Sequence, residues 1–152
     1  MTSTTLSQTT PQPPLPHVQG DLARQPARPF QVLYVEDDPA SQRLLVELFK
    51  TLPGFRLECA DSAEDGIELA HVRRPDLILM DLNLPSLDGF QAQGILAREY
   101  ATRHIPVVAL SARSLDDELQ RAESSGFLAY LTKPLDLGRL TALLHERAAL
   151  RD

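Results

Sequence analysis

The sequence is poor in cysteine: its 152 residues include only Cys59. A single cysteine excludes an internal disulfide and fits a reducing compartment. The sequence also lacks an apolar run of about 18 residues, the length that a membrane-spanning helix needs. Its first residues have neither the basic start nor the apolar block of a secretory signal. We therefore expect a cytoplasmic protein without a membrane span.

Basic residues are outnumbered by acidic ones. The chain has 15 Lys and Arg against 21 Asp and Glu, a net charge of −6. Phosphate backbones and anionic lipid surfaces repel a domain of this charge, so we expect neither nucleic acid nor membrane as a partner. The length suits one domain with a sizeable core.

Large apolar side chains are scarce in residues 1–29. This segment has a Ser/Thr/Gln-rich start and holds six of the twelve prolines. Such a segment cannot bury enough apolar surface to offset the entropy lost on ordering. We predict a disordered Pro/Thr/Gln-rich tail over 1–29 and one folded domain over 30–152.

From Phe30 onward, short apolar runs alternate with amphipathic stretches. The pattern predicts five strands, at 31–36, 55–60, 76–81, 105–111 and 127–132. It predicts five helices between and after them, at about 39–52, 62–73, 89–102, 114–125 and 136–150. This alternation is typical of right-handed βαβ units and a parallel sheet. The fold class is thus α/β, a doubly wound five-stranded sheet in the order 2-1-3-4-5 with helices on both faces.

In such a sheet, ligands bind at the carboxyl ends of the strands, where the strand order reverses. Polar residues end four of the five predicted strands. These residues are Glu36, Asp37 and Asp38 after the first strand, Asp81 at the third, Ser111 at the fourth and Lys133 after the fifth. The sequence therefore predicts that carboxylates, a hydroxyl and an ammonium meet at one edge.

This combination suits phosphoryl transfer onto Asp81. Carboxylates about 4 Å apart repel by roughly 4 kcal/mol at an effective dielectric of 20, and Mg²⁺ relieves such repulsion. A carboxylate beside Mg²⁺ can attack phosphorus and form an aspartyl phosphate. The cation, the Lys133 ammonium and the Ser111 hydroxyl could each bind one of the three phosphoryl oxygens.

Each of these residues also has a simpler interpretation. Asp81 could cap a turn, and residues 36–38 could only cap a helix. Ser111 taken alone is typical of a turn, and Lys133 taken alone is typical of a solvated surface. The convergence of three kinds of polar group on one edge favours the chemical interpretation.

Four stretches carry a family resemblance: VLYVEDDP, PDLILMDLNLPSLDG, IPVVALSA and YLTKP. In order and spacing they resemble the receiver domain of two-component response regulators. Asp37 precedes Asp81 by 44 residues, Asp81 precedes Ser111 by 30, and Ser111 precedes Lys133 by 22. The resemblance covers residues 31–149 and implies a flavodoxin-like, CheY-like fold.

The resemblance also implies roles for the acidic residues. Asp81 would be the phosphoacceptor. Glu36 and Asp37 would hold Mg²⁺, with Asp37 as the direct ligand, and the backbone carbonyl of Asn83 would supply a further ligand. Glu36 stands where the family more often has Asp. Asp38 stands where Asn is frequent, and we expect it to be a solvent-facing helix N-cap.

Three more positions follow from the resemblance. Ser111 would reach for a phosphoryl oxygen, and Lys133 would pair with the phosphate. Tyr130 occupies the aromatic position that swings inward on activation, although plain packing would explain it equally well. The bond from Lys133 to Pro134 would be cis.

The function implied is a stand-alone switch of a two-component or phosphorelay system. The phosphoryl donor would be a histidine kinase or a histidine phosphotransfer protein, docking on the helix at about 39–52. A downstream protein would recognise the face formed by the helix at 114–125, the strand around Tyr130 and the last helix. The chain would not be an enzyme beyond its own phosphorylation and dephosphorylation. A homodimer of the phosphorylated form is also open.

Three other functions fit parts of the pattern. An interaction module could keep the fold without phosphorylation, but the complete set of acids, Ser111 and Lys133 argues against it. Hydrolases of the haloacid dehalogenase type carry a second Asp two residues after the nucleophile, where this chain has Asn83. A nucleotide-binding flavodoxin-like protein needs a Gly- or Ser/Thr-rich loop after the first strand, where this chain has EDDPAS.

Overall fold

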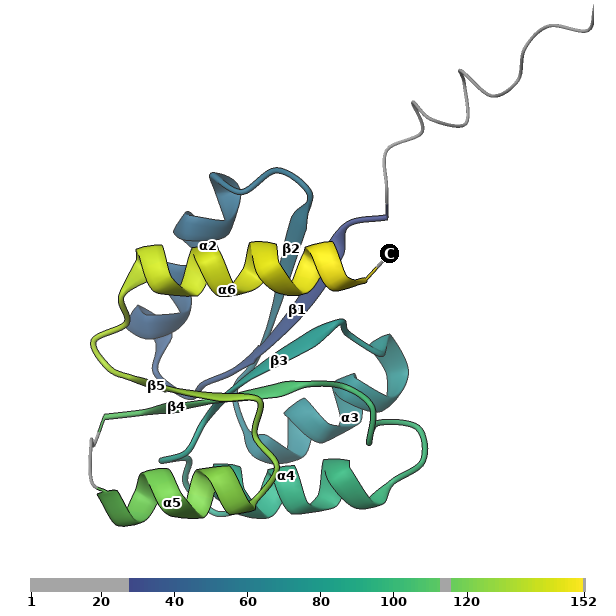
Figure 1. The fold of residues 1–152 in the computed structure, drawn as a ribbon, viewed down its shortest axis with the longest axis vertical. Helices are drawn as coiled ribbons and strands as arrows, with labels where there is room; N and C mark the ends of the chain where they lie inside the picture. The colour runs from purple at the N-terminus through teal and green to yellow at the C-terminus, as the bar shows by residue number, and fades with distance from the viewer. Residues whose placement is uncertain (1–27, 113–115, 152) are drawn as a thin grey trace, which may run out of the picture.

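The computed structural model describes residues 28–112 and 116–151. The predicted tail over 1–29 therefore lies almost wholly outside the described residues, as does the predicted start of the helix at 114. The described part contains five strands and five helices in strict alternation (Figure 1).

The strands are β1 (Phe30–Val35), β2 (Phe55–Ala60), β3 (Leu77–Asp81), β4 (Val107–Ser111) and β5 (Ala129–Thr132). The helices are α2 (Pro39–Lys50), α3 (Ala63–Arg73), α4 (Gly89–Arg98), α5 (Asp116–Ser124) and α6 (Leu137–Leu150). All strand pairs are parallel, and the order β2-β1-β3-β4-β5 confirms the predicted topology.

One predicted boundary is clearly wrong, because α4 ends at Arg98 and not near residue 102. Glu99 adopts an extended conformation with φ −89° and ψ 133°, which stops the helix. The chain then turns back, and the buried Thr102 hydroxyl donates to the Leu96 carbonyl at 2.8 Å. A side chain that satisfies a carbonyl at the helix end in this way replaces a further helical turn.

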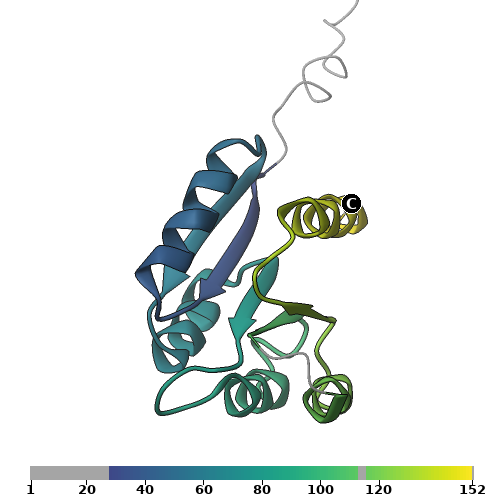
Figure 2. The ribbon, with the colours of Figure 1, turned by 90° about the vertical axis from the view of Figure 1, so that its left-hand side faces the viewer.

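The helices form a layer on each face of the sheet. Helices α2 and α6 cover one face, and α3, α4 and α5 cover the other (Figures 1 and 2). Side chains alternate between these layers along β1, because successive residues of a strand point to opposite faces. Tyr34 belongs to the same apolar cluster as Leu45 of α2 and Leu140 of α6, whereas Val35 belongs to the cluster that includes Ala70 of α3.

The central strands β3 and β4 are buried at every residue, in agreement with their unbroken apolar sequences. Their parallel register brings the carboxyl ends of the strands to a common edge. Val35 pairs with Met80, Asp81 with Leu110, and Ser111 with Thr132. The residues that end these strands are therefore neighbours in space.

The loop from β3 into α4 passes very close to Asp81, and Gly89 makes this approach feasible. A Cβ atom at Gly89 would lie 2.5 Å from the Asp81 carbonyl oxygen and 2.8 Å from the Leu82 Cα. Both neighbours are backbone atoms that cannot move aside alone. By contrast, a Cβ atom at Gly94 of the same helix would meet nothing within 4 Å.

We predict that Gly89→Ala lowers the free energy of unfolding by about 1–3 kcal/mol, because the loop must shift to admit the methyl group. The matched variant Gly94→Ala should raise it by roughly 0.5–1 kcal/mol, through the better helix propensity of Ala. Urea unfolding of both variants measures the difference. A Gly89→Ala variant as stable as Gly94→Ala would contradict the close approach.

Candidate functional site

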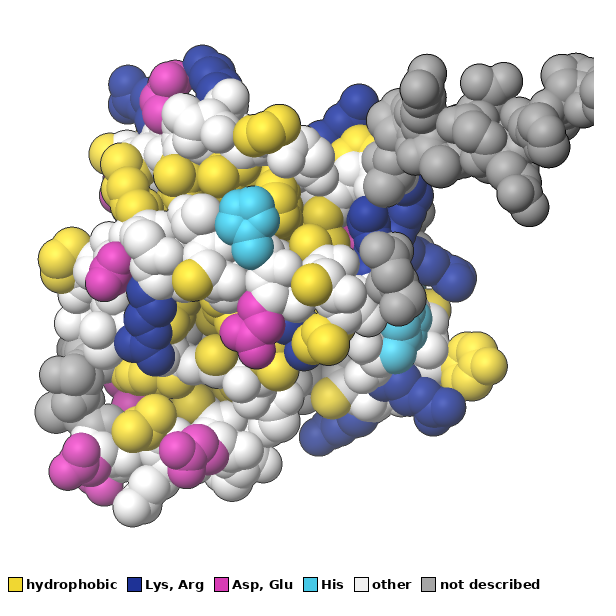
Figure 3. All heavy atoms as spheres, turned by 45° about the horizontal axis from the view of Figure 1, so that its top comes forward, with side chains coloured by type: hydrophobic (Ala, Val, Ile, Leu, Met, Phe, Trp, Pro, Cys, Tyr) yellow, Lys and Arg dark blue, Asp and Glu magenta, His cyan; other side chains and the backbone are white. Residues whose placement is uncertain are grey.

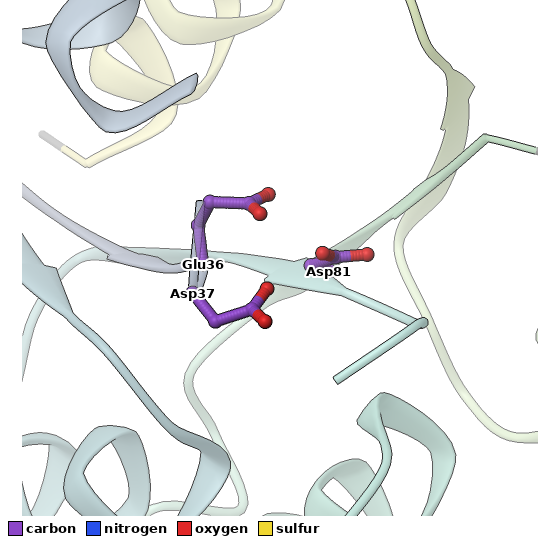
Figure 4. Close-up of side chains that lie close together, drawn as sticks. All are labelled: Glu36, Asp37 and Asp81. Carbon is purple, nitrogen blue, oxygen red and sulfur yellow. The ribbon is translucent and has the colours of Figure 1, made fainter. Parts of the chain in front are cut away.

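Three carboxylates converge at the junction of β1 and β3. Glu36 and Asp37 directly follow β1, and Asp81 ends the neighbouring strand β3. Oxygen atoms of the three side chains lie within 4.8 Å of one another (Figure 4). Glu36 and Asp81 are buried and Asp37 is exposed, so the cluster is open to solvent on one side. The predicted gathering of acids at this edge is confirmed.

The Glu36 carboxylate accepts three hydrogen bonds. The Lys133 Nζ donates to Oε2 at 2.5 Å, and the Tyr34 hydroxyl donates to the same oxygen at 3.2 Å. The backbone N–H of Asp38 donates to Oε1 at 3.1 Å. Burial raises the pKa of Glu36, the hydrogen bond from Lys133 lowers it, and the charge of Asp81 raises it again, so the net shift is upward.

Lys133 is the cation of the site. Its Nζ lies 2.5 Å from Glu36 Oε2 and 3.4 Å from Asp81 Oδ2. Burial lowers the pKa of Lys133, but the two carboxylates outweigh burial and leave the pKa above its usual value. Lys133 therefore stays protonated at neutral pH. The backbone N–H of Lys133 donates to the Ser111 carbonyl at 2.7 Å, and the bond to Pro134 is cis, as expected.

Asp81 turns one oxygen towards its own loop. Its Oδ1 accepts the backbone N–H of Asn83 at 2.9 Å, and the side chain is almost fully buried. The metal-binding role of the Asn83 carbonyl stays a prediction.

Asp38 lies outside the carboxylate cluster and caps α2, where its side chain accepts hydrogen bonds from the backbone N–H groups of Ala40 and Ser41. The structure thus confirms the N-cap prediction for Asp38.

Ser111 and Tyr130 belong to the neighbouring strands β4 and β5. Ser111 is fully buried and directly follows Leu110, the residue that pairs with Asp81. Its hydroxyl donates to Oε1 of Glu118, in the first turn of α5, at 2.5 Å. Tyr130 is half-buried and pairs in register with Ala109. The switch roles of Ser111 and Tyr130 stay predictions.

Sequence reasoning missed three contributors to the site. Tyr34 precedes Glu36 by two residues and shares its side of the strand, so the two-residue period could have identified it. Gln42 of α2 donates from Nε2 to the Glu36 carbonyl at 2.5 Å and to Asp61 at 2.8 Å. No local signal marked Glu118, because an acid in the first turn of a helix is favourable there without any contact to another strand.

The donor set suits a hard divalent cation. Carboxylate oxygens are the ligands that Mg²⁺ prefers, and the exposed side near Asp37 leaves room for water ligands. Within residues 28–112 and 116–151, Glu36, Asp37 and Asp81 are the one group of His, Cys or acidic side chains close enough to share a metal ion. The same residues include no helix long and apolar enough to cross a membrane.

Comparisons with known proteins all indicate the same family. Residues 32–145 match the family model of the response regulator receiver domain. The polar-differentiation response regulator DivK of Brucella anthropi is 32% identical over 111 residues, which cover 73% of this chain and 89% of DivK. The transcriptional regulatory protein AfsQ1 of Streptomyces coelicolor is 38% identical over 120 residues, 79% of this chain. The match spans about half (51%) of the length of AfsQ1.

Solved structures agree with this fold. The receiver domain of the sensor histidine kinase PA1611 from Pseudomonas aeruginosa has a TM-score of 0.71 and 30% identity, with 78% of this chain and 96% of that chain covered. Its structure has a magnesium ion coordinated in the active site cleft. The chemotaxis protein CheY4 of Vibrio cholerae has a TM-score of 0.72 at 20% identity, with 78% and 98% covered, which shows the shared fold alone.

We predict that Lys133→Met lowers the free energy of unfolding by about 2 kcal/mol at pH 7 without divalent ions. Removing one partner of a buried ion pair costs about 3–5 kcal/mol, and the partial exposure of Lys133 reduces this. Because the pKa of Glu36 is raised in the folded state, Glu36 takes up a proton at a higher pH in the folded chain than in the unfolded chain. The loss should therefore be smaller at pH 5 than at pH 7, because a larger fraction of Glu36 is then neutral.

The control is Lys50→Met, which removes an exposed lysine that pairs with Glu47 in α2. Such surface pairs contribute about 0.5 kcal/mol. Urea unfolding at the two pH values compares the variants. Equal losses for Lys133 and Lys50, or a Lys133 loss that does not change with pH, would contradict this description of the site.

Proposed function

Because this chain belongs to the response regulator receiver family, we propose that it is a phosphorylation-controlled signalling switch that accepts a phosphoryl group on Asp81. The donor is a histidine kinase or a histidine phosphotransfer protein, and the reaction depends on Mg²⁺. The output is a protein–protein contact with a downstream target. The chain acts in the cytoplasm and catalyses no reaction beyond its own phosphorylation and dephosphorylation.

One observation carries the proposal: the carboxylate cluster of Glu36, Asp37 and Asp81 shares its edge of the sheet with the ammonium of Lys133. The match of residues 32–145 to the receiver family supports the same interpretation. So does the magnesium ion in the active site cleft of the PA1611 receiver domain, which is 30% identical to this chain.

In the proposed reaction, an Asp81 oxygen attacks the phosphorus of a phosphohistidine. A phosphorus–oxygen bond forms to Asp81, the phosphorus–nitrogen bond breaks, and the imidazole leaves with its electron pair and takes up a proton. Mg²⁺ would neutralise charge on the phosphoryl oxygens when bound to Glu36, Asp37, Asp81 and the Asn83 carbonyl. Lys133 already lies 3.4 Å from Asp81 and can pair with the transferred group.

The buried hydroxyl of Ser111 links phosphorylation to the output face. In the structure this hydroxyl donates to Glu118 of α5. To bind a phosphoryl oxygen it must leave Glu118, which removes a contact between β4 and α5. The space so vacated would admit Tyr130, and the face formed by α5, β5 and α6 would change.

The direct test is the intact mass of the protein after incubation with acetyl phosphate and Mg²⁺. We expect a single phosphoryl adduct that requires Mg²⁺ and is lost in Asp81→Asn, because the amide is not a nucleophile towards phosphorus. Asp38→Asn is the matched control. It removes an adjacent acid outside the cluster but keeps the helix cap, so it should retain the adduct.

Two results would count against the proposal. An adduct that persists in Asp81→Asn would place the acceptor elsewhere. No adduct from acetyl phosphate or from a histidine kinase, in a protein that still binds Mg²⁺, would favour a module that signals without phosphate.

A further inference from the structure

The opposite edge of the sheet carries a basic hollow that the proposed switch does not use. The hollow lies where β1, β3 and β4 begin and α6 ends, and has a volume of about 450 Å³. Its charged and titratable lining comprises Arg28, Arg74, Asp76, His104, Arg147 and Arg151. We name these six residues the basic hollow. Four arginines from three separate parts of the chain thus line one space.

The one carboxylate among the described lining residues already pairs with two arginines. Asp76 accepts from Arg28 Nη2 at 2.8 Å and from the backbone N–H of Gln31 at 2.8 Å. Arg151 Nη1 lies 3.6 Å from the same side chain. Arg151 Nη2 also donates to the Arg28 carbonyl at 2.6 Å. Asp76 thus shares its single negative charge between the guanidinium groups of Arg28 and Arg151.

The remaining basic residues of the hollow lack such partners. Among residues 28–112 and 116–151, no carboxylate lies within ion-pair distance of Arg74, Arg147 or His104. Among the described residues that line it, four arginines stand against one aspartate, an excess of three positive charges in a chain whose net charge is −6. Figure 3 shows Lys and Arg side chains gathered on the right-hand side of that view, around a histidine.

A second, smaller hollow adjoins the first and is also lined by basic residues. It has a volume of about 300 Å³ and shares Arg74 and His104 with the basic hollow. It adds Arg103, whose guanidinium lies 4.8 Å from the centre of the Tyr100 ring. The Tyr100 side chain is exposed. The cationic surface therefore continues past Arg74 and includes an open aromatic ring.

We propose that the basic hollow binds a small ligand that carries two or more phosphate groups. Guanidinium groups bind phosphate through two parallel hydrogen bonds, and the unpaired Arg74 and Arg147 are free of competing carboxylates among the described residues. The volume is in the range of small-molecule sites, about 300–1,000 Å³. The buried residues Phe30, Pro75 and Ile105 complete the lining of the hollow.

This site is separate from the proposed phosphorylation site. The basic hollow lies at the edge of the sheet where the strands begin, whereas Asp81 and its neighbours lie at the edge where the strands end. A strand of five residues spans about 17 Å. Ligand binding at the basic hollow should therefore require neither Mg²⁺ nor an intact Asp81.

The test is isothermal titration calorimetry of the full chain with tripolyphosphate and, separately, with ATP, in EDTA at about 50 mM salt. We expect both ligands to bind, with an affinity that falls as salt rises to about 300 mM, since salt screens exposed charges. The double variant Arg74→Asn, Arg147→Gln should bind at least about tenfold more weakly, because it loses charged hydrogen bonds. Asn suits position 74, where φ is +47°.

The control is Arg43→Gln, Arg139→Gln, which removes the same charge from the N-terminal halves of α2 and α6, away from the basic hollow. It should bind like the native chain, as should Asp81→Asn. Tighter binding of ATP than of tripolyphosphate would identify a nucleotide as the ligand, and equal binding would identify the phosphate chain alone. Absence of binding, or an equal loss in the control, would overturn the proposal.

Discussion

Repulsion among three carboxylates is the constraint on which the rest of this structure depends. Glu36, Asp37 and Asp81 place their oxygens within 4.8 Å of one another, and among residues 28–112 and 116–151 Lys133 supplies the one ammonium that contacts them. Within this described part of the chain, three carboxylates thus share one cation at the edge of the sheet. Such an arrangement costs folding free energy, so it is expected only where a cation or a transferred phosphoryl group uses it.

The fold holds this cluster together through contacts of several kinds. Strand order places β1 beside β3, so that Glu36 and Asp81 are neighbours. The Tyr34 hydroxyl and the backbone N–H of Asp38 donate hydrogen bonds that hold the Glu36 carboxylate in place. Gly89 lets the next loop approach Asp81 closely. The same sheet separates charge along its length, with acids where strands end and arginines where they begin.

Much of the site could be predicted from the sequence, because the strands concerned are unbroken apolar runs. Such a run leaves little doubt about where Asp81 or Ser111 lies, and parallel topology then gathers the strand ends. Asp38 could be assigned as a cap from the Pro39 that follows it. The Ser111–Glu118 hydrogen bond could not be predicted, because it depends on the placement of α5 against the sheet.

The basic hollow was equally hidden from sequence reasoning. Its arginines lie at positions 28, 74, 147 and 151, and no motif connects them. The net charge of −6 also concealed it, because a sum over the chain carries no information about where charges lie. Only the tertiary fold, which brings the start of β1 beside the end of α6, assembles the hollow.

The most direct measurement of the central claim is the free energy of unfolding as a function of Mg²⁺ concentration. If the carboxylate cluster binds a cation, the free energy of unfolding of the native chain should rise with Mg²⁺ concentration, as expected for a ligand that binds only the folded state. Asp37→Asn should be more stable than the native chain without Mg²⁺ and should gain little from it. A native chain indifferent to Mg²⁺, or an equal gain in Asp37→Asn, would contradict the account.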